Sequence, residues 1–167
     1  MRRAFVGLFI ALMAAGILWG QSAAMPMTPG ETIGGKRIVL AEAVSGHTSV
    51  LVMSFSRAAG NGSNAWARSV RADSAMAGVS VYQVAMLEKA PGLVRGVIRN
   101  GLRKGLTASE QDNYVILTQD EKLWRSYFSV TAEKDPYVEL IDATGRVRWH
   151  GHGEAKDLEP LLKAALK

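Results

Sequence analysis

The chain of 167 residues contains no cysteine. Thiol–disulfide exchange and thiol-dependent peroxide reduction both require a thiolate nucleophile, so these two classes of activity are excluded. A lipoprotein anchor is excluded for the same reason. A cysteine-free chain also forms no disulfide, so we expect its stability to come from packing alone.

Other signals of function are also scarce. Aromatic residues make up 7% of the chain, and its net charge is +5, without a basic platform interleaved with aromatics. We therefore expect no nucleic-acid partner. No G-x-S-x-G nucleophile elbow occurs, which disfavours a serine hydrolase. The hydrophobic content of 48% is that of one globular domain. We expect a protein that is not an enzyme and has no cofactor.

The N-terminus has the pattern of a secretory signal. Arg2 and Arg3 precede an apolar run from Ala4 to Trp19, and the small residues Ser22-Ala23-Ala24 follow. We predict a signal peptide over 1–24 and an exported, periplasmic protein. The alternative is an uncleaved segment that anchors the protein at the outer face of the inner membrane.

The remaining chain alternates between strand and helix patterns. After an irregular lead-in over 25–36, a single domain is expected over 37–167. The expected strands are 37–44, 49–55, 79–87, 114–117, 137–141 and 146–149, and the expected helices are 64–77, 93–106, 120–128 and 157 onward. Helices between strands predict an α/β fold with a central mixed sheet and helices on both faces. Asp142 to Gly145 has the composition of a hairpin turn.

The stretch from Asp135-Pro136-Tyr137 through Trp149 to Gly153 resembles the C-terminal half of thioredoxin-like proteins. Within that superfold it looks most like the assembly factors that mitochondria use for the membrane sector of ATP synthase, which have bacterial relatives. The resemblance implies a thioredoxin-like three-layer sandwich. It also implies a non-redox assembly factor whose protein partner is a membrane-embedded subunit. By the same resemblance, the Asp135–Pro136 peptide bond is expected to be cis.

A loop is expected between the apolar strand that ends at Phe55 and the helix that begins near Asn64. Ser56, Arg57 and Asn61 lie in this loop, at the carboxyl end of a central strand, where open α/β sheets bind ligands. With Pro136, these residues are candidates for a surface that receives a carboxylate or a peptide carbonyl. The alternative is an ordinary connecting loop. Trp66 and Phe55 are expected in the core.

The second helix carries an arginine ridge formed by Arg95, Arg99 and Arg103. The spacing places the three side chains on one face, beside an apolar stripe expected to point inward. That stripe consists of Val94, Val97, Ile98 and Leu102. The ridge is a candidate for peripheral contact with anionic lipid or with an acidic partner; the alternative is a solvated helix face.

His150 and His152 are two residues apart in an expected strand, so their rings lie on one face. Two ligands on one face are the minimum for a metal site, although two alone seldom hold a metal tightly. This pair supports an alternative function as a metal-handling periplasmic protein. We expect no metal site, and the two histidines are its only candidates.

Overall fold

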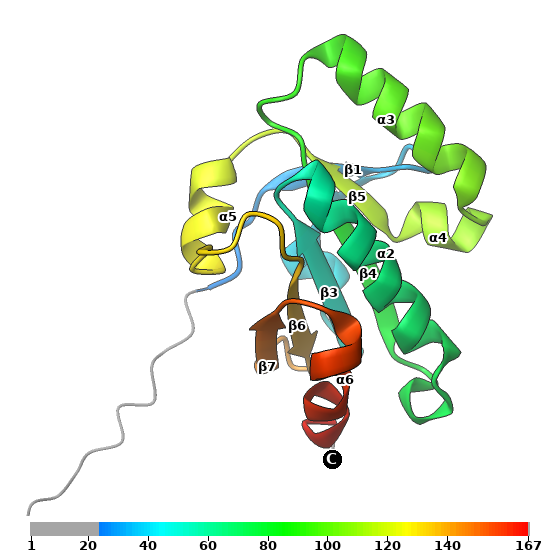
Figure 1. The fold of residues 1–167 in the computed structure, drawn as a ribbon, viewed down its shortest axis with the longest axis vertical. Coiled ribbons are helices and arrows are strands. Elements are labelled where there is room, and N and C mark those ends of the chain that lie inside the picture. Colours follow the sequence, from blue (N-terminus) through cyan, green and yellow to red (C-terminus); the bar gives the residue numbers. More distant parts are fainter. Residues whose placement is uncertain (1–23, 167) are drawn as a thin grey trace, which may run out of the picture.

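The structure, a computed structural model, describes residues 24–166. The expected signal peptide therefore lies almost wholly outside the described residues. The described chain contains a seven-stranded sheet in the order β2-β1-β5-β4-β3-β6-β7 (Figure 1). Its strands are β1 (Pro29–Thr32), β2 (Arg37–Val39), β3 (Ser49–Ser54), β4 (Ser80–Met86), β5 (Tyr114–Leu117), β6 (Tyr137–Ile141) and β7 (Val147–His152). The central strands β3, β4 and β5 run parallel, whereas β6 and β7 add an antiparallel edge.

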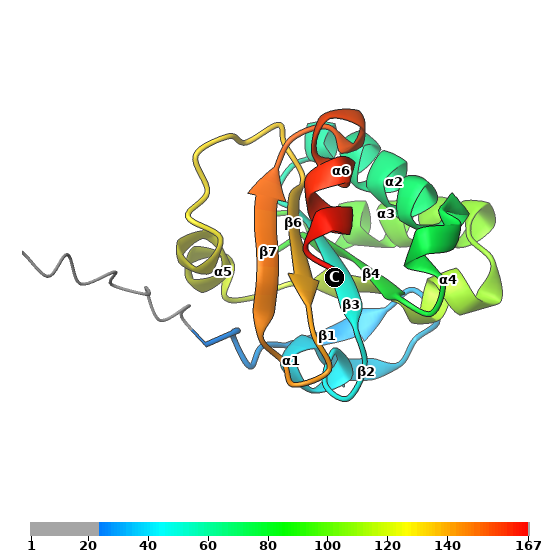
Figure 2. The same cartoon turned by 90° about the horizontal axis from the view of Figure 1, so that it is seen from below.

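Helices cover both faces of this sheet, as expected (Figure 2). The helices are α1 (Leu40–Ala43), α2 (Arg57–Ala72), α3 (Gly92–Gly105), α4 (Ala108–Asp112), α5 (Glu121–Tyr127) and α6 (Ala155–Ala164), and a short 3₁₀ turn, η1, spans Ser74–Met76. Alternate residues of β3 point to opposite faces. Val50 and Val52 pack under α2 and α6, whereas Leu51 and Met53 pack under α1 and α5. The mixed three-layer α/β sandwich is thus confirmed.

Two N-terminal expectations are wrong. The lead-in is not irregular, because Pro29–Thr32 forms β1, which pairs with both β2 and β5. The strand expected over 37–44 ends at Val39, and α1 follows at once. The sequence reads as one apolar run because Leu40 and Val44 are buried in the same core as the strands. Periodicity does not separate a short buried helix from a strand.

The loop expected before Asn64 is helical instead. Ser56 caps α2 by accepting a hydrogen bond from the Ala59 amide at 3.2 Å, so the helix begins at Arg57. Gly60 and Gly62 made the segment look like a loop. A side chain at Gly62 would place its Cβ 2.9 Å from Pro136 Cδ, so the glycine allows close contact between the helix and the proline. The packing of α2 against the strands outweighs the low helix propensity of glycine.

The chain around Pro136 departs from expectation in one respect. No peptide bond between described residues is cis, so the Asp135–Pro136 bond is trans. The buried proline ring contacts Gly62 in this form, and trans is the lower-energy isomer. The hairpin turn beyond β6 is confirmed. The Gly145 amide donates to the Asp142 carbonyl at 2.9 Å, and Gly145 has a φ of +81°, which favours glycine.

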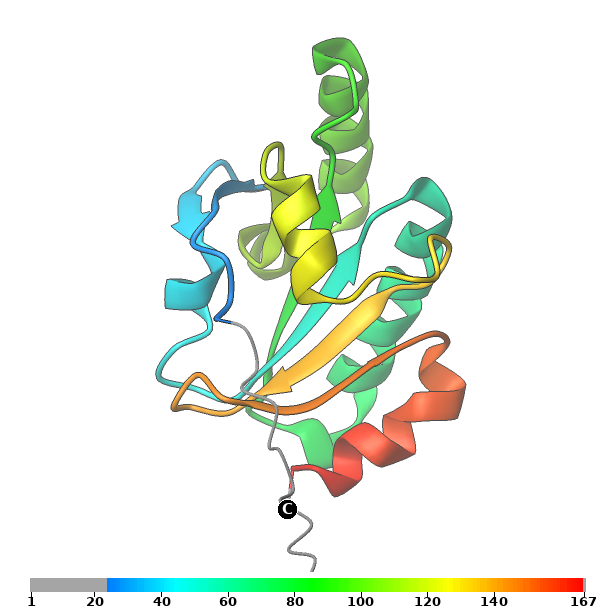
Figure 3. The same cartoon turned by 90° about the vertical axis from the view of Figure 1, so that its left-hand side faces the viewer.

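Helix α3 projects from one end of the molecule (Figure 3). None of its residues is fully buried, and the expected inward stripe is confirmed only in part. Val94 and Val97 are exposed, whereas Leu102 packs against the buried cluster that includes Ile33 and Tyr114. Two arginines also hold the helix in place: Arg99 pairs with Glu31 of β1, and Arg103 donates to the Ile33 carbonyl at 2.9 Å.

Reversing the charge of Arg99 is therefore expected to weaken the attachment of α3. Arg99→Glu should lower the free energy of unfolding by about 1 kcal/mol, because the side chains are partly exposed and screened by solvent. Adding Glu31→Arg to Arg99→Glu should restore most of the loss in urea denaturation. Lys104→Glu, on an exposed residue of the same helix, is the matched control. No recovery in the double variant would contradict the pairing.

No helix among residues 24–166 is long and apolar enough to cross a membrane.

Candidate functional site

A groove lies between α2 and α3, above the carboxyl ends of β3 and β4. Its volume is about 1010 Å³. Two strand-to-helix connections meet here. Strand β3 ends at Ser54 and leads into α2, and strand β4 ends at Met86 and leads through a short loop into α3. This is the edge of an open α/β sheet where ligands bind, so the groove is the candidate site.

The α3 wall of the groove is apolar. Leu93, Val94 and Val97 form its outer part, and Ile98 and Leu102 lie deeper. Leu93 is 90% exposed and Val97 is 73% exposed, which is unusual for large aliphatic side chains that recur on one helix face. A contiguous exposed apolar surface of this kind marks a binding surface.

The α2 wall is polar. Arg57, Gly60, Asn61 and Asn64 line it, at the spacing of one helix face. The groove floor includes Ala85 and the largely buried side chain of Tyr114. The two walls therefore differ in chemistry, apolar on α3 and hydrogen-bonding on α2.

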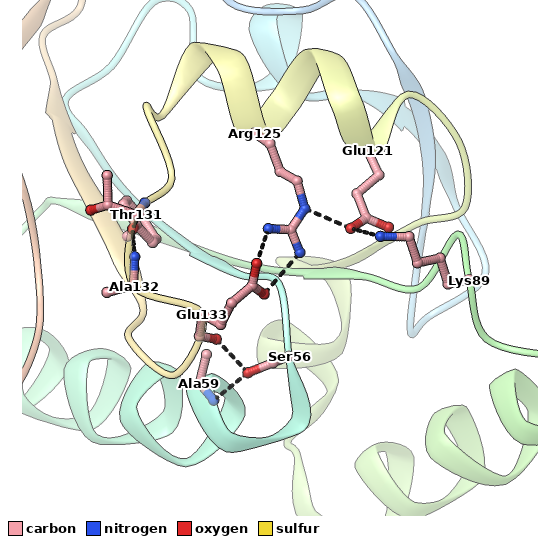
Figure 4. Close-up of polar contacts among 9 residues, drawn as sticks. Ser56, Ala59, Lys89, Glu121, Arg125, Thr131, Ala132 and Glu133 are labelled. Carbon is pink, nitrogen blue, oxygen red and sulfur yellow. Dashed lines mark hydrogen bonds and ion pairs between the residues drawn. The ribbon is translucent and has the colours of Figure 1, made fainter.

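A charged network closes one end of the groove (Figure 4). Arg125 Nε lies 2.6 Å from Glu121 Oε1, and Lys89 Nζ lies 2.9 Å from the same oxygen. Arg125 also pairs with Glu133 and stacks over the ring of Phe55 at 5.1 Å. The network joins α5, the loop before α3 and the loop before β6 into one rim.

Burial alone would raise the pKa of Glu121, but the hydrogen bonds from Lys89 and Arg125 outweigh it and hold the pKa below its ordinary value. The Glu133 pKa is lowered mainly by its hydrogen bond with Arg125. Both carboxylates therefore stay charged at neutral pH, and neither is tuned to exchange a proton there.

Ser56 is one of the residues for which the sequence suggested a binding surface. Its hydroxyl donates to the Glu133 carbonyl at 2.6 Å (Figure 4) and accepts from Ala59. The loop that carries Glu133 is held by Tyr137, whose hydroxyl accepts hydrogen bonds from the amides of Thr131 and Ala132, both at 2.8 Å. Ser56 thus fastens this loop to the start of α2.

The structure separates the predicted site residues. Ser56, Arg57 and Asn61 line the groove, whereas Pro136 packs behind α2 and does not. The arginine ridge is turned away from the groove, and Arg95 donates to the carbonyls of Ala90 and Glu88.

The two histidines share the exposed face of β7, as expected. His152 Nδ1 lies 2.8 Å from Asp135 Oδ2, and the ring stacks on Tyr137. Within residues 24–166, no group of three or more histidine, aspartate and glutamate side chains is arranged to hold a metal ion. The metal-handling alternative therefore gains no support from this pair.

Sequence reasoning missed the rim residues and misplaced the apolar wall. Lys89, Glu121, Arg125 and Glu133 are far apart in sequence, and no spacing rule connects them. The sequence did show one signal for the apolar wall. The apolar stripe and the arginine ridge lie next to each other on α3, so the sequence allows either of them to face the sheet.

Solved structures with a similar fold cover most of this chain. StoA from Bacillus subtilis has a TM-score of 0.55 at 15% identity, over 87% of this chain and 100% of that one. ScoI from Arabidopsis thaliana has a TM-score of 0.54 at 12% identity, over 86% and 98%. A thioredoxin family protein from Chlorobium tepidum has a TM-score of 0.50 at 19% identity, over 87% and 100%. At these identities the likeness shows the fold, which is thioredoxin-like.

No curated protein sequence matches the chain. A protein-family model does, and the match runs from residue 14 to residue 166, which includes the whole sheet and both walls of the groove. The family is described as ATP10 protein and comprises ATP synthase assembly factors. On this match, and with the thioredoxin-like fold that the resemblance had implied, the chain belongs to the ATP10 protein family.

Proposed function

We propose that this protein is a non-catalytic assembly chaperone that holds an apolar helical segment of a membrane-embedded ATP synthase subunit in the groove between α2 and α3. The observation that carries the proposal is the exposed apolar wall formed by Leu93, Val94 and Val97. An amphipathic or apolar helix placed in such a groove buries apolar surface, which is the usual driving force of helix-in-groove recognition.

The dimensions of the groove support a helical occupant. Its apolar wall runs along α3, a helix of 14 residues. At 1.5 Å per residue, this corresponds to about 21 Å, which matches a helical segment of similar length. Part of a membrane-spanning helix that is not yet inserted or not yet assembled presents such a surface.

The absence of catalysis is supported by the chemistry of the groove. The chain has no thiol, the groove lining contains no histidine, and the Ser56 hydroxyl is engaged with Glu133. A serine nucleophile requires an adjacent general base. The two carboxylates of the groove, Glu121 and Glu133, have their pKa values lowered by hydrogen bonds with basic side chains and are engaged in ion pairs. We propose an exported location as well, on the basis of the charged, apolar and small-residue order over 1–24.

The proposed function predicts that a charge on the apolar wall abolishes activity without unfolding the protein. In a strain that lacks the protein, the level of assembled ATP synthase should fall while synthesis of its subunits is unchanged. The wild-type chain should restore assembly, and Leu93→Asp combined with Val97→Asp should not. Both side chains are mostly exposed, so the double variant should keep its thermal midpoint within a few degrees.

Asn100→Asp is the matched control, since Asn100 is exposed on the same helix but does not line the groove. It adds one negative charge and should restore assembly fully. Site-specific photocrosslinkers at position 97 and at position 100 should distinguish the two faces, with a membrane subunit captured only from position 97. Normal ATP synthase levels in the deletion strain would refute the proposal.

A further inference from the structure

The polar side of the groove contains hydrogen-bonding groups that the protein leaves unused. Tyr114 is only 4% exposed and lines the groove floor, yet its hydroxyl makes no hydrogen bond to another residue in the range 24–166. The exposed Asn61 side chain is also without a hydrogen bond among these residues. The Asn64 carbonyl oxygen accepts from Gln83 at 2.9 Å, which leaves its amide NH₂ group as a donor toward the groove.

Among residues 24–166 the only buried side-chain polar atom without a partner is Trp124 Nε1, so the Tyr114 hydroxyl is accessible to water in the groove. An occupant that displaces this water must replace its hydrogen bond, because polar groups buried in folded proteins are nearly always hydrogen-bonded. Other polar groups on this sheet follow the rule. The buried Ser54 hydroxyl donates to the Val84 carbonyl at 3.0 Å, and the buried Gln83 amide is held by α2. Burial raises the pKa of Tyr114 to about 12, so its hydroxyl stays neutral at physiological pH and can donate a hydrogen bond.

A uniformly apolar occupant would cover these groups and remove them from water without replacing their hydrogen bonds. That loss weakens binding by about 5- to 150-fold for each buried group left unpaired. An occupant with hydrogen-bonding side chains on one face avoids the loss. Because Asn61, Asn64 and Tyr114 are all neutral, they match neutral partners, such as serine, threonine, asparagine or glutamine.

We infer that the groove selects an amphipathic helix, with an apolar face against Leu93 and Val97 and a row of neutral hydrogen-bonding side chains against Asn61, Asn64 and Tyr114. This inference rests on the proposed function, since it concerns the occupant of the same groove. It specifies the client further: a helix with a polar stripe, of the kind that faces other helices within a membrane complex, rather than a uniformly lipid-facing one.

Two synthetic peptides test the inference. Both are 18-residue leucine–alanine helices with a fluorescent label, and one carries three asparagines at positions i, i+4 and i+7 where the other has alanines. Binding to the full chain is measured by fluorescence anisotropy in dodecyl maltoside. The asparagine peptide should bind about tenfold more tightly, and Tyr114→Phe combined with Asn61→Ala should remove most of that advantage. Asn100→Ala, outside the groove, should retain it.

The outcomes separate the inference from the proposed function. Equal binding of both peptides, or an equal loss for both in the double variant, would overturn the inference and leave the groove as an apolar-helix site. Failure of both peptides to bind the wild-type chain would overturn the proposed function itself. Asn61→Ala alone changes an exposed side chain and should leave the protein folded. The binding of both peptides to this single variant can therefore be compared even if the double variant unfolds.

Discussion

Replacing Trp66 by alanine is expected to cost about 3–5 kcal/mol of folding free energy, as is typical of a large aromatic side chain removed from a core. Trp66 is 0% exposed and anchors α2 against the sheet, which confirms the expectation from sequence. Its indole N–H donates to the Gly153 carbonyl at 2.9 Å, at the start of the loop into α6. The substitution therefore removes both packing and a hydrogen bond. Most single domains are stable by only about 5–15 kcal/mol, so the variant should be marginally folded.

Urea denaturation followed by far-UV circular dichroism gives the measurement. Trp66→Phe separates the two contributions, because it keeps most of the buried ring and loses the hydrogen bond; we expect a loss of about 1–2 kcal/mol. Arg68→Ala, on an exposed residue of the same helix, is the control and should change stability by less than about 0.5 kcal/mol. A loss below about 1 kcal/mol for Trp66→Ala would contradict the packing described for α2.

The second large effect is a fall in stability as the pH rises, caused by Glu139. This carboxyl is 5% exposed and lies on β6, between Leu51 of β3 and His150 of β7. Burial raises its pKa to about 7, against the opposing effect of a hydrogen bond from the Tyr127 hydroxyl. Because the folded-state pKa exceeds the unfolded value of 4.5, the folded protein binds more protons than the unfolded chain between these values.

Stability should therefore decrease from about pH 4.5 to about pH 7 and level off above it. At 1.36 kcal/mol per pKa unit, the total is about 3 kcal/mol, as an order of magnitude. Glu139→Gln is neutral at every pH and can still accept the Tyr127 hydrogen bond. We expect it to match the wild type near pH 4 and to be more stable than the wild type by about 2–3 kcal/mol at pH 8.

The comparison uses the difference between the two proteins at each pH, measured by urea denaturation. His150 lies directly opposite Glu139 on β7, so Glu139→Gln in a His150→Gln background serves as a second comparison that removes this neighbour. Tyr127 does not interfere, since burial raises its pKa above the ordinary value. A pH-independent difference would show that Glu139 is not protonated in the folded state near neutral pH.

The fold could be predicted from the sequence wherever one physical requirement dominated. The apolar run of β3 is buried on both faces, so it could only be a central strand. The Asp142–Gly145 turn needs a glycine at positive φ and has one. Rules based on the local sequence failed where contacts between distant residues determined the structure. Gly62 lies within a helix, where its lack of a side chain allows Pro136 to pack against it, and nothing near Gly62 in the sequence indicates that contact.

Only one wall of the groove could be predicted from the sequence, because the other wall depends on contacts between distant residues. Ser56, Arg57 and Asn61 follow from the rule that ligands bind at the carboxyl ends of strands, and they do line the groove. The opposite wall could not be assigned, because the orientation of α3 depends on Glu31 and the Ile33 carbonyl, about 70 residues away. Periodicity shows that a helix has two faces, and long-range partners determine which of them is buried.

The attachment of α3 has a consequence for hydrogen exchange. Helix α3 has no fully buried residue and is held by two arginine contacts and by the partly buried Leu102. It therefore contributes little to the cooperative core and should open as a unit of its own, at a free energy below that of global unfolding. Its backbone amides would then exchange with solvent deuterium long before those of β3 and β4. Under the function proposed above, a wall that opens independently would let the distance between α2 and α3 vary, so that helices of different diameter are admitted and released while the sheet stays intact. If the groove binds a helix as proposed, deuterium uptake over Gly92–Gly105 should slow on binding, and this segment would then report binding directly.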